Sequence, residues 1–223
     1  MNKKDLLKKY NKILNVLLKI YNKLNVSNKF KINKSDSFFY YACLFKKFKL
    51  VSRGQNNKIK LKGLSKFIHS NIFINGNNNV IEIDENCRFN NTTIVVEGDN
   101  NYIKIGEYTS FYGLCELAVI EGTKIIIGKN CLFSSEIKFR TGDSHSVVDL
   151  DNKRINPSKD ILVGDHVWIG TRALILKGSK VNNNSIVSAG AIVTKAFEES
   201  NVILAGCPAK IIKKDVNWLS ERI

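Results

Sequence analysis

The stretch VGDHVWIGTRALILKGSKVNNNSIVSAGAIV, residues 163–193, carries a repeat of six residues that decides the fold. A period of six fits neither the 3.6 residues of an α-helix nor the alternation of a single strand. Its glycine, valine and asparagine content also disfavours a helix. It fits short strands separated by corners, with three sides closing a coil of about eighteen residues, so we expect a parallel β-helix. The large β-branched residues should point inward, and they are Val163, Ile169, Ile175, Val181, Val187 and Val193. Mostly small residues follow them by four positions, where the chain must turn, and these are Val167, Ala173, Ser179, Ser185 and Ala191.

A looser repeat with a spacing of 22 precedes the hexads. GNNNVIEID (76–84) aligns with GDNNYIKIG (98–106), and Ile83, Ile105 and Ile127 keep the same spacing. We interpret these segments as coils with a few extra residues at one corner. Asparagine suits such corners because it tolerates left-handed backbone angles.

The repeats predict three parts: a basic helical segment over residues 1–56, a β-helix over residues 57–212 and a tail over residues 213–223. Apolar residues at helical spacing predict an amphipathic helix over residues 3–25. Packing of this helix on the β-helix or on another subunit is the first interpretation, and attachment to a membrane surface through residues 1–25 is the alternative. The cluster FFYYACLF (38–45) is expected to form core between helix and coils.

Charge is concentrated at the N-terminal end of the chain. Residues 1–70 hold 18 Lys and Arg against 2 acids, whereas residues 71–223 hold 17 against 18. The main domain is therefore not expected to bind nucleic acid, and the basic segment could meet an anionic membrane or polymer. The N-terminus does not resemble a secretory signal, so we expect a cytoplasmic protein, with the inner face of the membrane as a peripheral address. The five cysteines form no CxxC pair and are expected to be reduced and buried.

One interruption of the hexads predicts where the chemistry lies. Between Phe139 and Ile161 the pattern is lost, and we expect residues 140–160 to form an extruded loop. The loop holds His145, which could act as a general base, and Asp143, which either orients the imidazole or belongs to a turn. Trp168 should point outward, where it needs cover from a ligand or a subunit. His166 should also point outward, as an interface or supporting residue.

The segment from Asp143 to Lys213 resembles the hexapeptide-repeat acyltransferases, and among them the bacterial capsule, sialic-acid and polysaccharide O-acetyltransferases. The resemblance covers about residues 76–213 and rests on the motifs DxH, HVWIG, ILKG, SAGAIVTK and AGxPAK. It implies a left-handed parallel β-helix, a homotrimer with active sites between neighbouring subunits, and transfer of acetyl from acetyl-CoA to a sugar hydroxyl without a metal. The acceptor is expected to be a surface polysaccharide, such as capsule, sialic acid or lipopolysaccharide.

The resemblance also implies roles for individual residues. His145, Asp143 and Trp168 would be catalytic, and Glu116 would bind the acceptor at a position where galactoside-specific relatives carry asparagine, which argues against a galactoside. Cys207 replaces the more usual Asn or Val in AGxPAK. The residues implied in cofactor binding are Thr171, Ala189, Thr194, Lys195, Lys210 and Lys213.

Three other functions remain open at the level of sequence. One is N-acetylation of a nucleotide-linked amino sugar, although no glycine-rich nucleotide-binding pattern precedes the coils. Another is serine acetylation, for which the segment before the coils is short. The third is a β-helix without transferase activity, such as a zinc carbonic anhydrase or a scaffold. A zinc site would need His69, His145 and His166, whose spacing offers no local ligand pair.

Overall fold

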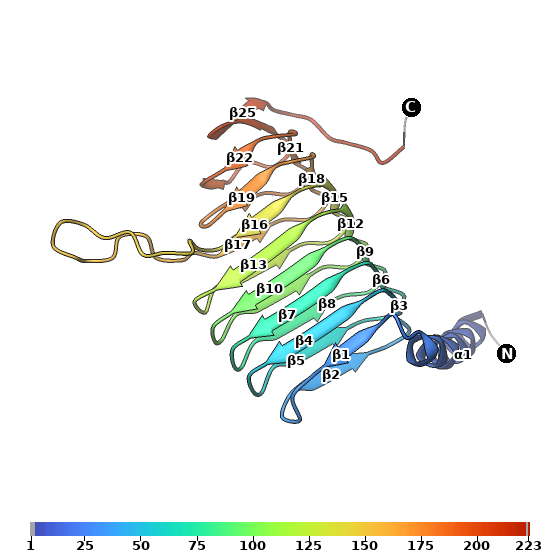
Figure 1. Ribbon diagram of the computed structural model, residues 1–223. Coiled ribbons are helices and arrows are strands. Elements are labelled where there is room, and N and C mark those ends of the chain that lie inside the picture. Colours follow the sequence, from blue (N-terminus) through green and yellow to red (C-terminus); the bar gives the residue numbers. More distant parts are fainter. Residues whose placement is uncertain (1–2, 222) are drawn as a thin grey trace.

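The computed structural model describes the backbone of residues 3–221 and 223, and the side chains of residues 10–221 and 223. Residues 1–2 of the expected N-terminal segment lie outside the described residues. One helix, α1 (Lys3–Leu24), precedes a column of three parallel sheets (Figure 1). Each coil contributes one strand to each sheet, and eight coils form the left-handed β-helix that the hexads and the resemblance predict.

We call the three sheets A, B and C, in the order in which each coil passes through them. Sheet A contains β1 (Lys29–Lys31), β4 (Lys49–Arg53), β7 (Asn71–Asn75), β10 (Thr93–Glu97), β13 (Glu116–Ile120), β16 (Lys138–Arg140), β19 (Leu174–Leu176) and β22 (Ile192–Val193). Sheet B contains β2 (Ser37–Tyr40), β5 (Lys58–Leu61), β8 (Val80–Ile83), β11 (Tyr102–Ile105), β14 (Lys124–Ile127), β17 (Ile161–Val163), β20 (Lys180–Val181) and β23 (Ala196–Phe197). Sheet C contains β3 (Leu44–Lys46), β6 (Lys66–Ile68), β9 (Arg88–Asn90), β12 (Ser110–Gly113), β15 (Leu132–Ser135), β18 (Trp168–Ile169), β21 (Ile186–Val187), β24 (Ile203–Gly206) and β25 (Ala209–Lys213). Only β25 runs antiparallel to its neighbour, β24.

The core is a narrow apolar column inside the three sheets. All six large residues of the hexads are buried, as are the five residues four positions after them. In the lower coils a ladder of phenylalanines fills the interior beneath sheet C. The ring centroids of Phe67 and Phe89 lie 4.7 Å apart, and those of Phe89 and Phe111 lie 4.9 Å apart. Stacking of identical residues in successive coils therefore stabilises the column from end to end.

The two sequence repeats correspond to two coil lengths. Paired residues in the middle coils are 22 positions apart, as in Thr93 with Asn71, whereas those in the upper coils are 18 apart, as in Trp168 with Ile186. The extra residues lie at the corner between sheets A and B, where Asn78 and Asn100 have φ of +56° and +60°. The asparagine that follows each of them is buried, and the side chain of Asn79 accepts a hydrogen bond from the backbone of Asn101 at 2.9 Å. The left-handed backbone and the buried hydrogen bonds of the corner therefore account for the positions of these asparagines.

Three expectations from sequence need correction. The coils begin at Lys29, not near Asn57, because the whole first coil and the first strand of the second coil lie within residues 1–56, where outward positions carry lysine. The cluster FFYYACLF is part of the first coil, where Phe45 is buried in the column itself and not between the column and α1. Four cysteines are buried and free, but Cys207 is exposed on the turn between β24 and β25.

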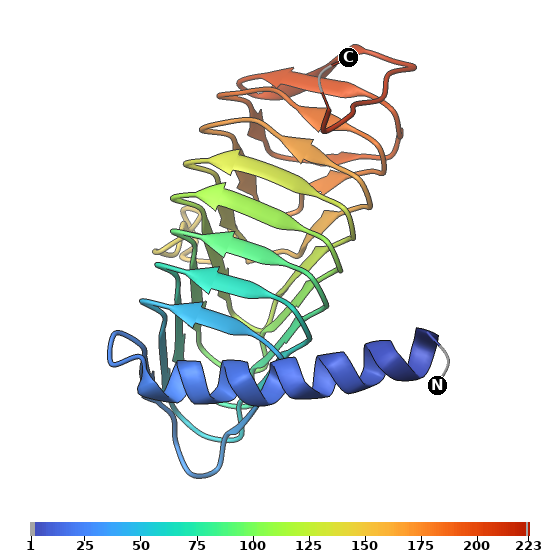
Figure 2. The ribbon, with the colours of Figure 1, turned by 90° about the vertical axis from the view of Figure 1, so that its right-hand side faces the viewer.

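The helix α1 lies beside the base of the column, below β3, and extends outward past the coils (Figures 1 and 2). It covers the free edge of β3, since Asn22 donates from Nδ2 to the carbonyl of Cys43 at 2.8 Å and accepts from the backbone of Phe45 at 3.0 Å. No helix in the described part of the chain is both long and apolar enough to cross a bilayer.

Candidate active site

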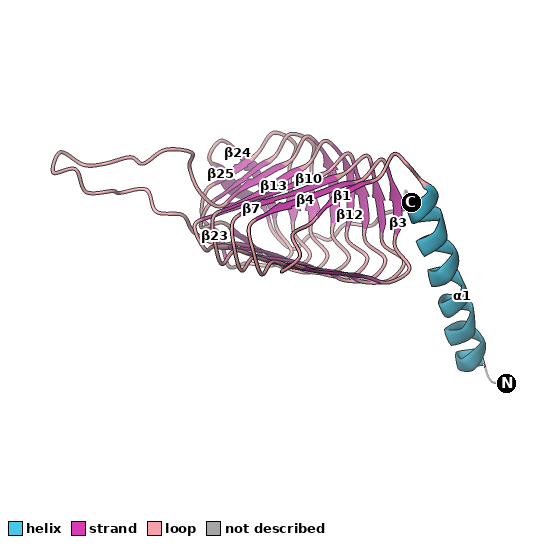
Figure 3. Ribbon diagram, turned by 60° about the horizontal axis from the view of Figure 1, so that its bottom comes forward, coloured by secondary structure: helices cyan, strands magenta, loops and turns pink. Residues whose placement is uncertain are grey.

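The loop of residues 141–160 leaves the column at the corner between sheets A and B, between β16 and β17. It projects far beyond the coils, on the side of the column away from α1 (Figures 1 and 3). This confirms that the single interruption of the hexads is one extruded segment. Strand pairing resumes directly above it, with Ile125 opposite Ile161.

The outer part of the loop is a short hairpin. Val148 and Arg154 form an isolated antiparallel bridge, and the backbone of Ile155 donates to Val147 at 2.8 Å. At its tip the carboxylate of Asp149 accepts from the backbone of Lys153 at 2.8 Å. The loop therefore has regular hydrogen bonding of its own, although its side chains lie largely in solvent.

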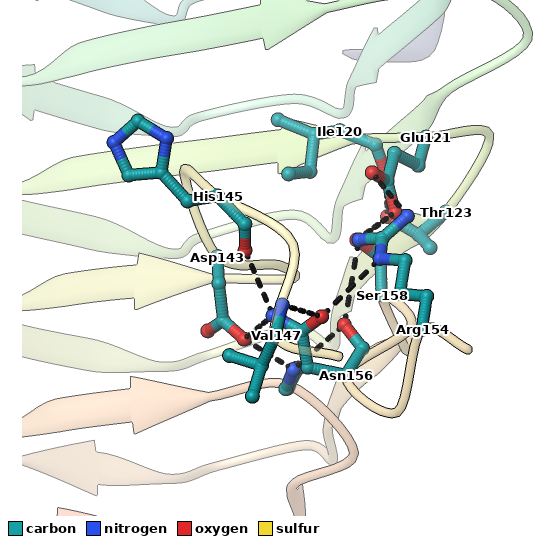
Figure 4. Close-up of polar contacts among 10 residues, drawn as sticks. Ile120, Glu121, Thr123, Asp143, His145, Val147, Arg154, Asn156 and Ser158 are labelled. Carbon is teal, nitrogen blue, oxygen red and sulfur yellow. Dashed lines mark hydrogen bonds and ion pairs between the residues drawn. The ribbon is translucent and has the colours of Figure 1, made fainter. Parts of the chain in front are cut away.

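Asn156 is the centre of the hydrogen bonding beneath the hairpin (Figure 4). Its Oδ1 accepts from the backbone of Val147 at 2.7 Å and from Nε of Arg154 at 3.2 Å. Its Nδ2 donates to Oδ2 of Asp143 at 2.8 Å and to the carbonyl oxygen of His145 at 2.9 Å. One amide thus joins both arms of the loop and fixes the backbone that carries His145.

His145 is exposed, and its ring projects away from the carboxylate of Asp143 (Figure 4). Asp143 Oδ2 instead accepts hydrogen bonds from Lys177 Nζ at 2.5 Å and from Asn156. The Lys177 ammonium first and the Asn156 amide second hold the pKa of Asp143 below its usual range. The expected orientation of the imidazole by Asp143 is therefore replaced by an indirect contact, through Asn156 to the His145 carbonyl.

A second set of contacts ties the loop to the coil below. Arg154 forms an ion pair with Glu121 at 2.9 Å, and Ser158 Oγ donates to the same carboxylate at 2.7 Å. These two hydrogen bonds, with that of Arg154 the larger influence, lower the pKa of Glu121. At the loop base Gly142 packs closely, since a Cβ there would lie 2.1 Å from Ser158 Oγ and 2.5 Å from Cδ1 of Ile120, so a larger residue would require these two side chains to shift.

A pocket of about 210 Å³ lies on the outer face of sheet A, beside the start of the loop. Glu116 and Arg140 face each other across adjacent strands there, with 2.6 Å between Glu116 Oε1 and Arg140 Nη2. Gly142, Asp143 and Ser144 complete the side nearest the loop. Glu116, expected to contact the acceptor, thus lines the same pocket as the residues that immediately precede His145.

Three other predicted residues lie together at the opposite end of sheet A, at its corner with sheet C. Trp168, Thr171 and Ala189 line one pocket of about 390 Å³. Gly170 allows the close approach of two coils there, because a Cβ would lie 2.6 Å from the backbone nitrogen of Ala189. Trp168 points outward as predicted, with a ring centroid 6.3 Å from that of Trp218 in the C-terminal tail.

The four remaining residues that were predicted to bind the cofactor, namely Thr194, Lys195, Lys210 and Lys213, lie in the last coils of the column. Lys213 pairs with Ile203, which lines the pocket of Trp168, and Lys210 is exposed on the same strand. Thr194 and Lys195 are exposed at the corner between sheets A and B, two coils above the loop. The three histidines occupy three different corners, and His166 stacks on Trp218 with centroids 4.3 Å apart.

Within one chain, the cluster of Glu116 beside the loop of His145 and the cluster of Trp168 lie at opposite ends of sheet A. Thr171 and Lys177 mark the two ends of one side of the column, and six residues of extended chain span about 20 Å. The loop that carries His145 projects further from the Lys177 end. The sequence missed Asn156, Lys177, Glu121 and Arg154, and the only local signal for them was the Asn-Pro pair at 156–157.

Comparisons with known proteins find O-acetyltransferases that are similar to this chain in sequence and fold. No family model matches the sequence. The chain is 32% identical over 104 residues to a polysialic acid O-acetyltransferase of Neisseria meningitidis, covering 46% of this chain and 48% of that protein. It is 30% identical over 105 residues to the galactoside O-acetyltransferase of Escherichia coli K12, covering 47% and 51%. These matches therefore span about half the length of the curated relatives.

Solved structures match over a much larger part of the chain. The polysialic acid O-acetyltransferase OatWY is 30% identical, with a TM-score of 0.78 over 89% of this chain and 90% of that one. The polySia-specific acetyltransferase NeuO is 28% identical, with a TM-score of 0.76 over 87% and 86%. The shared fold thus includes the coils that the sequence repeats did not reveal.

Proposed function

Because the chain belongs to the hexapeptide-repeat acyltransferases, we propose that it transfers an acetyl group from acetyl-CoA to a sugar hydroxyl of a bacterial surface polysaccharide. The observation that carries this proposal is the position of His145. It stands on the one extruded loop, next to a pocket with an acidic and a basic side chain, on a fold shared with two polysialic acid O-acetyltransferases.

His145 acts as the general base. Its imidazole accepts the proton of the sugar hydroxyl while the oxygen attacks the thioester carbonyl. The tetrahedral intermediate then collapses and expels the CoA thiolate, which takes up the proton from the imidazolium. Backbone N–H groups stabilise the oxyanion in such reactions. Glu116 and Arg140 hold the acceptor, since the carboxylate can accept from sugar hydroxyls and the guanidinium can donate to them.

Acetyl-CoA occupies the corner of Trp168, Thr171 and Ala189. The small residues and the outward Trp168 leave room there for an extended chain, and the pocket continues toward β24 and β25. The exposed ammonium groups of Lys210 and Lys213 are suitable partners for the CoA phosphates. Thr194 and Lys195, on the other corner, contact the cofactor from the neighbouring subunit.

The active site is completed by two chains of a homotrimer. This proposal is supported by the distance of about 20 Å between the two clusters along one side of the column, together with the outward direction of the loop. A neighbouring column can bring its Trp168 corner to the loop of the first chain. The closed arrangement of three such contacts uses the same pair of surfaces each time.

The acceptor is an anionic polysaccharide. Two observations support this: the relatives named above include enzymes named for polysialic acid, and the first 70 residues carry 18 Lys and Arg against 2 acids. Lys49 and Arg53 lie on sheet A, the sheet whose upper strands form the pocket of Glu116. A polymer that extends down this face would meet positive charge.

The test compares two matched histidine variants in a thiol-release assay with acetyl-CoA and a panel of anionic and neutral glycans. His145→Asn should lower kcat by about 10²–10⁴. His69→Asn should leave the rate unchanged, because asparagine accepts the left-handed φ of +52° at that corner. Acetyl groups released from the product by mild base identify an ester. A base-stable product, or full activity of His145→Asn, would refute the proposal.

Mixing variants tests the shared site separately. His145→Asn and Trp168→Ala should each be inactive alone. When the two are co-expressed, a random trimer regains intact sites at about a quarter of its interfaces, so about a quarter of the activity should return. If the mixture stays inactive while both variants assemble normally, the site is contained in one chain.

A further inference from the structure

The base of the column is built in a way that catalysis does not require. α1 lies where a preceding coil would supply a strand to sheet C, and its asparagines hydrogen bond to the open edge. Asn15 Oδ1 accepts from the backbone of Ala42 at 2.8 Å, and Asn22 bonds to Cys43 and Phe45. Asn15 and Asn22 therefore face the column, and the half-buried Leu14 and Leu18 beside them line a pocket against β3. These contacts protect the edge strand from pairing with other chains.

The other apolar residues of α1 whose side chains are described form a stripe that faces away from the coils. At 100° per residue, the centre of its apolar stripe lies roughly opposite Asn15 and Asn22. The side chains of the stripe are between 51% and 74% exposed, and they belong to Tyr10, Ile13, Leu17, Ile20 and Leu24. Exposure of a contiguous apolar stripe to water is unfavourable, and such patches mark interaction sites, so the stripe indicates a contact surface.

The apolar surface continues from the helix onto the open end of the core. Phe30 packs on Phe45 and Phe48, with centroids 5.7 and 5.8 Å away, yet 41% of it is exposed. Lys19 Nζ lies 6.0 Å from the centre of the Tyr40 ring, which places one flank of α1 beside the same aromatic cluster. Helix and core end together form one basal surface, composed of α1 and the outer face of the first coil.

The charge around the basal surface selects its partner. Lys12, Lys19 and Lys23 are exposed on one flank of the stripe, and Lys29 and Lys31 are exposed on β1. The first 70 residues contain only two acids, so a second copy of this surface would bring like charges together. Anionic lipid headgroups complement the lysines, and acyl chains accommodate the stripe.

We propose that the basal surface docks the protein on an anionic lipid bilayer, with α1 lying in the plane of the interface. The column then stands upright on the membrane. The loop of His145 belongs to the sixth coil, five steps of about 4.8 Å above the first, so it stands about 24 Å from the base. The docking does not depend on the proposed reaction, but it would hold the catalytic loop at a constant height over the membrane surface.

The test is flotation of the full-length protein with phosphatidylcholine vesicles that contain or lack phosphatidylglycerol. Wild type should float with the anionic vesicles and much less with the neutral ones, and added salt should release it. Lys12→Gln and Lys19→Gln should each lower the partition coefficient about fivefold. Leu17→Glu with Ile20→Glu should abolish flotation, because both side chains belong to the exposed stripe.

Ile212→Glu is the matched control, an equally exposed aliphatic residue on β25, at the other end of the column. It should float as wild type does. Circular dichroism and thermal melting should show that the Leu17→Glu, Ile20→Glu protein is folded. If wild type fails to float with anionic vesicles, the proposal is overturned. If, in addition, the paired Glu substitutions lower the oligomer mass by ultracentrifugation, the stripe is an interface between copies of the chain.

Discussion

Replacement of Asn156 by alanine should disorder the catalytic loop while the column remains intact. The amide accepts from Val147 and Arg154 and donates to Asp143 and to the carbonyl of His145, at distances from 2.7 to 3.2 Å. Alanine leaves none of these four contacts. The loop then keeps its backbone hairpin but loses the junction between the arms beneath it.

The magnitude follows from the number and exposure of these bonds. Each hydrogen bond contributes about 0.5–1.5 kcal/mol net, and the partial exposure of Asn156 places the sum near the lower end, at about 2 kcal/mol. If the imidazole must be held in position for catalysis, kcat should fall by about 10- to 100-fold. The melting temperature should change little, since the coils bury none of the affected groups.

Two measurements check this, namely steady-state kinetics and hydrogen exchange at the backbone amides of Val147 and Ile155. Both amides should exchange faster in Asn156→Ala, while those of the coils should not. Asn152→Gly is the matched control in the same loop, because glycine accepts the φ of +61° found there. Unchanged kcat together with unchanged exchange at Val147 would show that Asn156 does not position the loop.

Three further predictions concern the loop, the core and the thiols. Asp143 and Glu121 have lowered pKa values in the folded protein. Their contribution to loop order is therefore complete above the ordinary carboxyl pKa near 4 and is lost as pH falls through the lowered values. Hydrogen exchange should show loss of protection in the loop in that acid range before the coils unfold. Phe111→Ala should lower the free energy of unfolding by about 3–5 kcal/mol in urea titrations, since this 1% exposed ring lies 4.9 and 4.8 Å from the phenylalanines of the adjacent coils. Iodoacetamide should modify Cys207 alone in the native protein, as judged by peptide mass spectrometry. Burial raises the pKa of Cys43, Cys87 and Cys131 to about 12 and shields these thiols from the reagent. Cys115 is also buried.

The fold was predictable where the coils have a constant length. From Val163 to Val193 each side of the column uses six residues, so the inward positions follow one another without a break. In the first coils the steps vary, with Lys29 opposite Lys49 but Lys49 opposite Asn71. Without a fixed period, the sequence of these coils shows only apolar residues that alternate with lysines. The coils before Asn57 could therefore not be recognised as a repeat.

The site was predictable only for groups whose chemistry shows in the residue type. His145 could be singled out because a loop histidine has few structural roles, and Trp168 because the hexad phase places a large ring outward; their proposed roles in the reaction stay predictions. Lys177 pairs with Asp143 across 34 positions of sequence, and that pairing depends on how the loop folds back over the next coil. Asn156 is one of many asparagines in the chain, and nothing in its surroundings in sequence distinguishes it from those that form corners.

The proposed division of the site between two corners agrees with the architecture of the column. A coil returns to the same corner only once in every three sides, and its inward residues are committed to the core, so a single corner offers few outward side chains. Chemistry that needs a base, an acceptor pocket and a long cofactor cannot be assembled at one corner. In the proposed site the loop carries His145 away from the column at one end of sheet A, whereas the pocket of Trp168 lies at the other end, where Gly170 lets two coils approach. Neither feature can move toward the other without breaking strand pairing, and association of identical columns is the arrangement by which we expect both to reach one substrate.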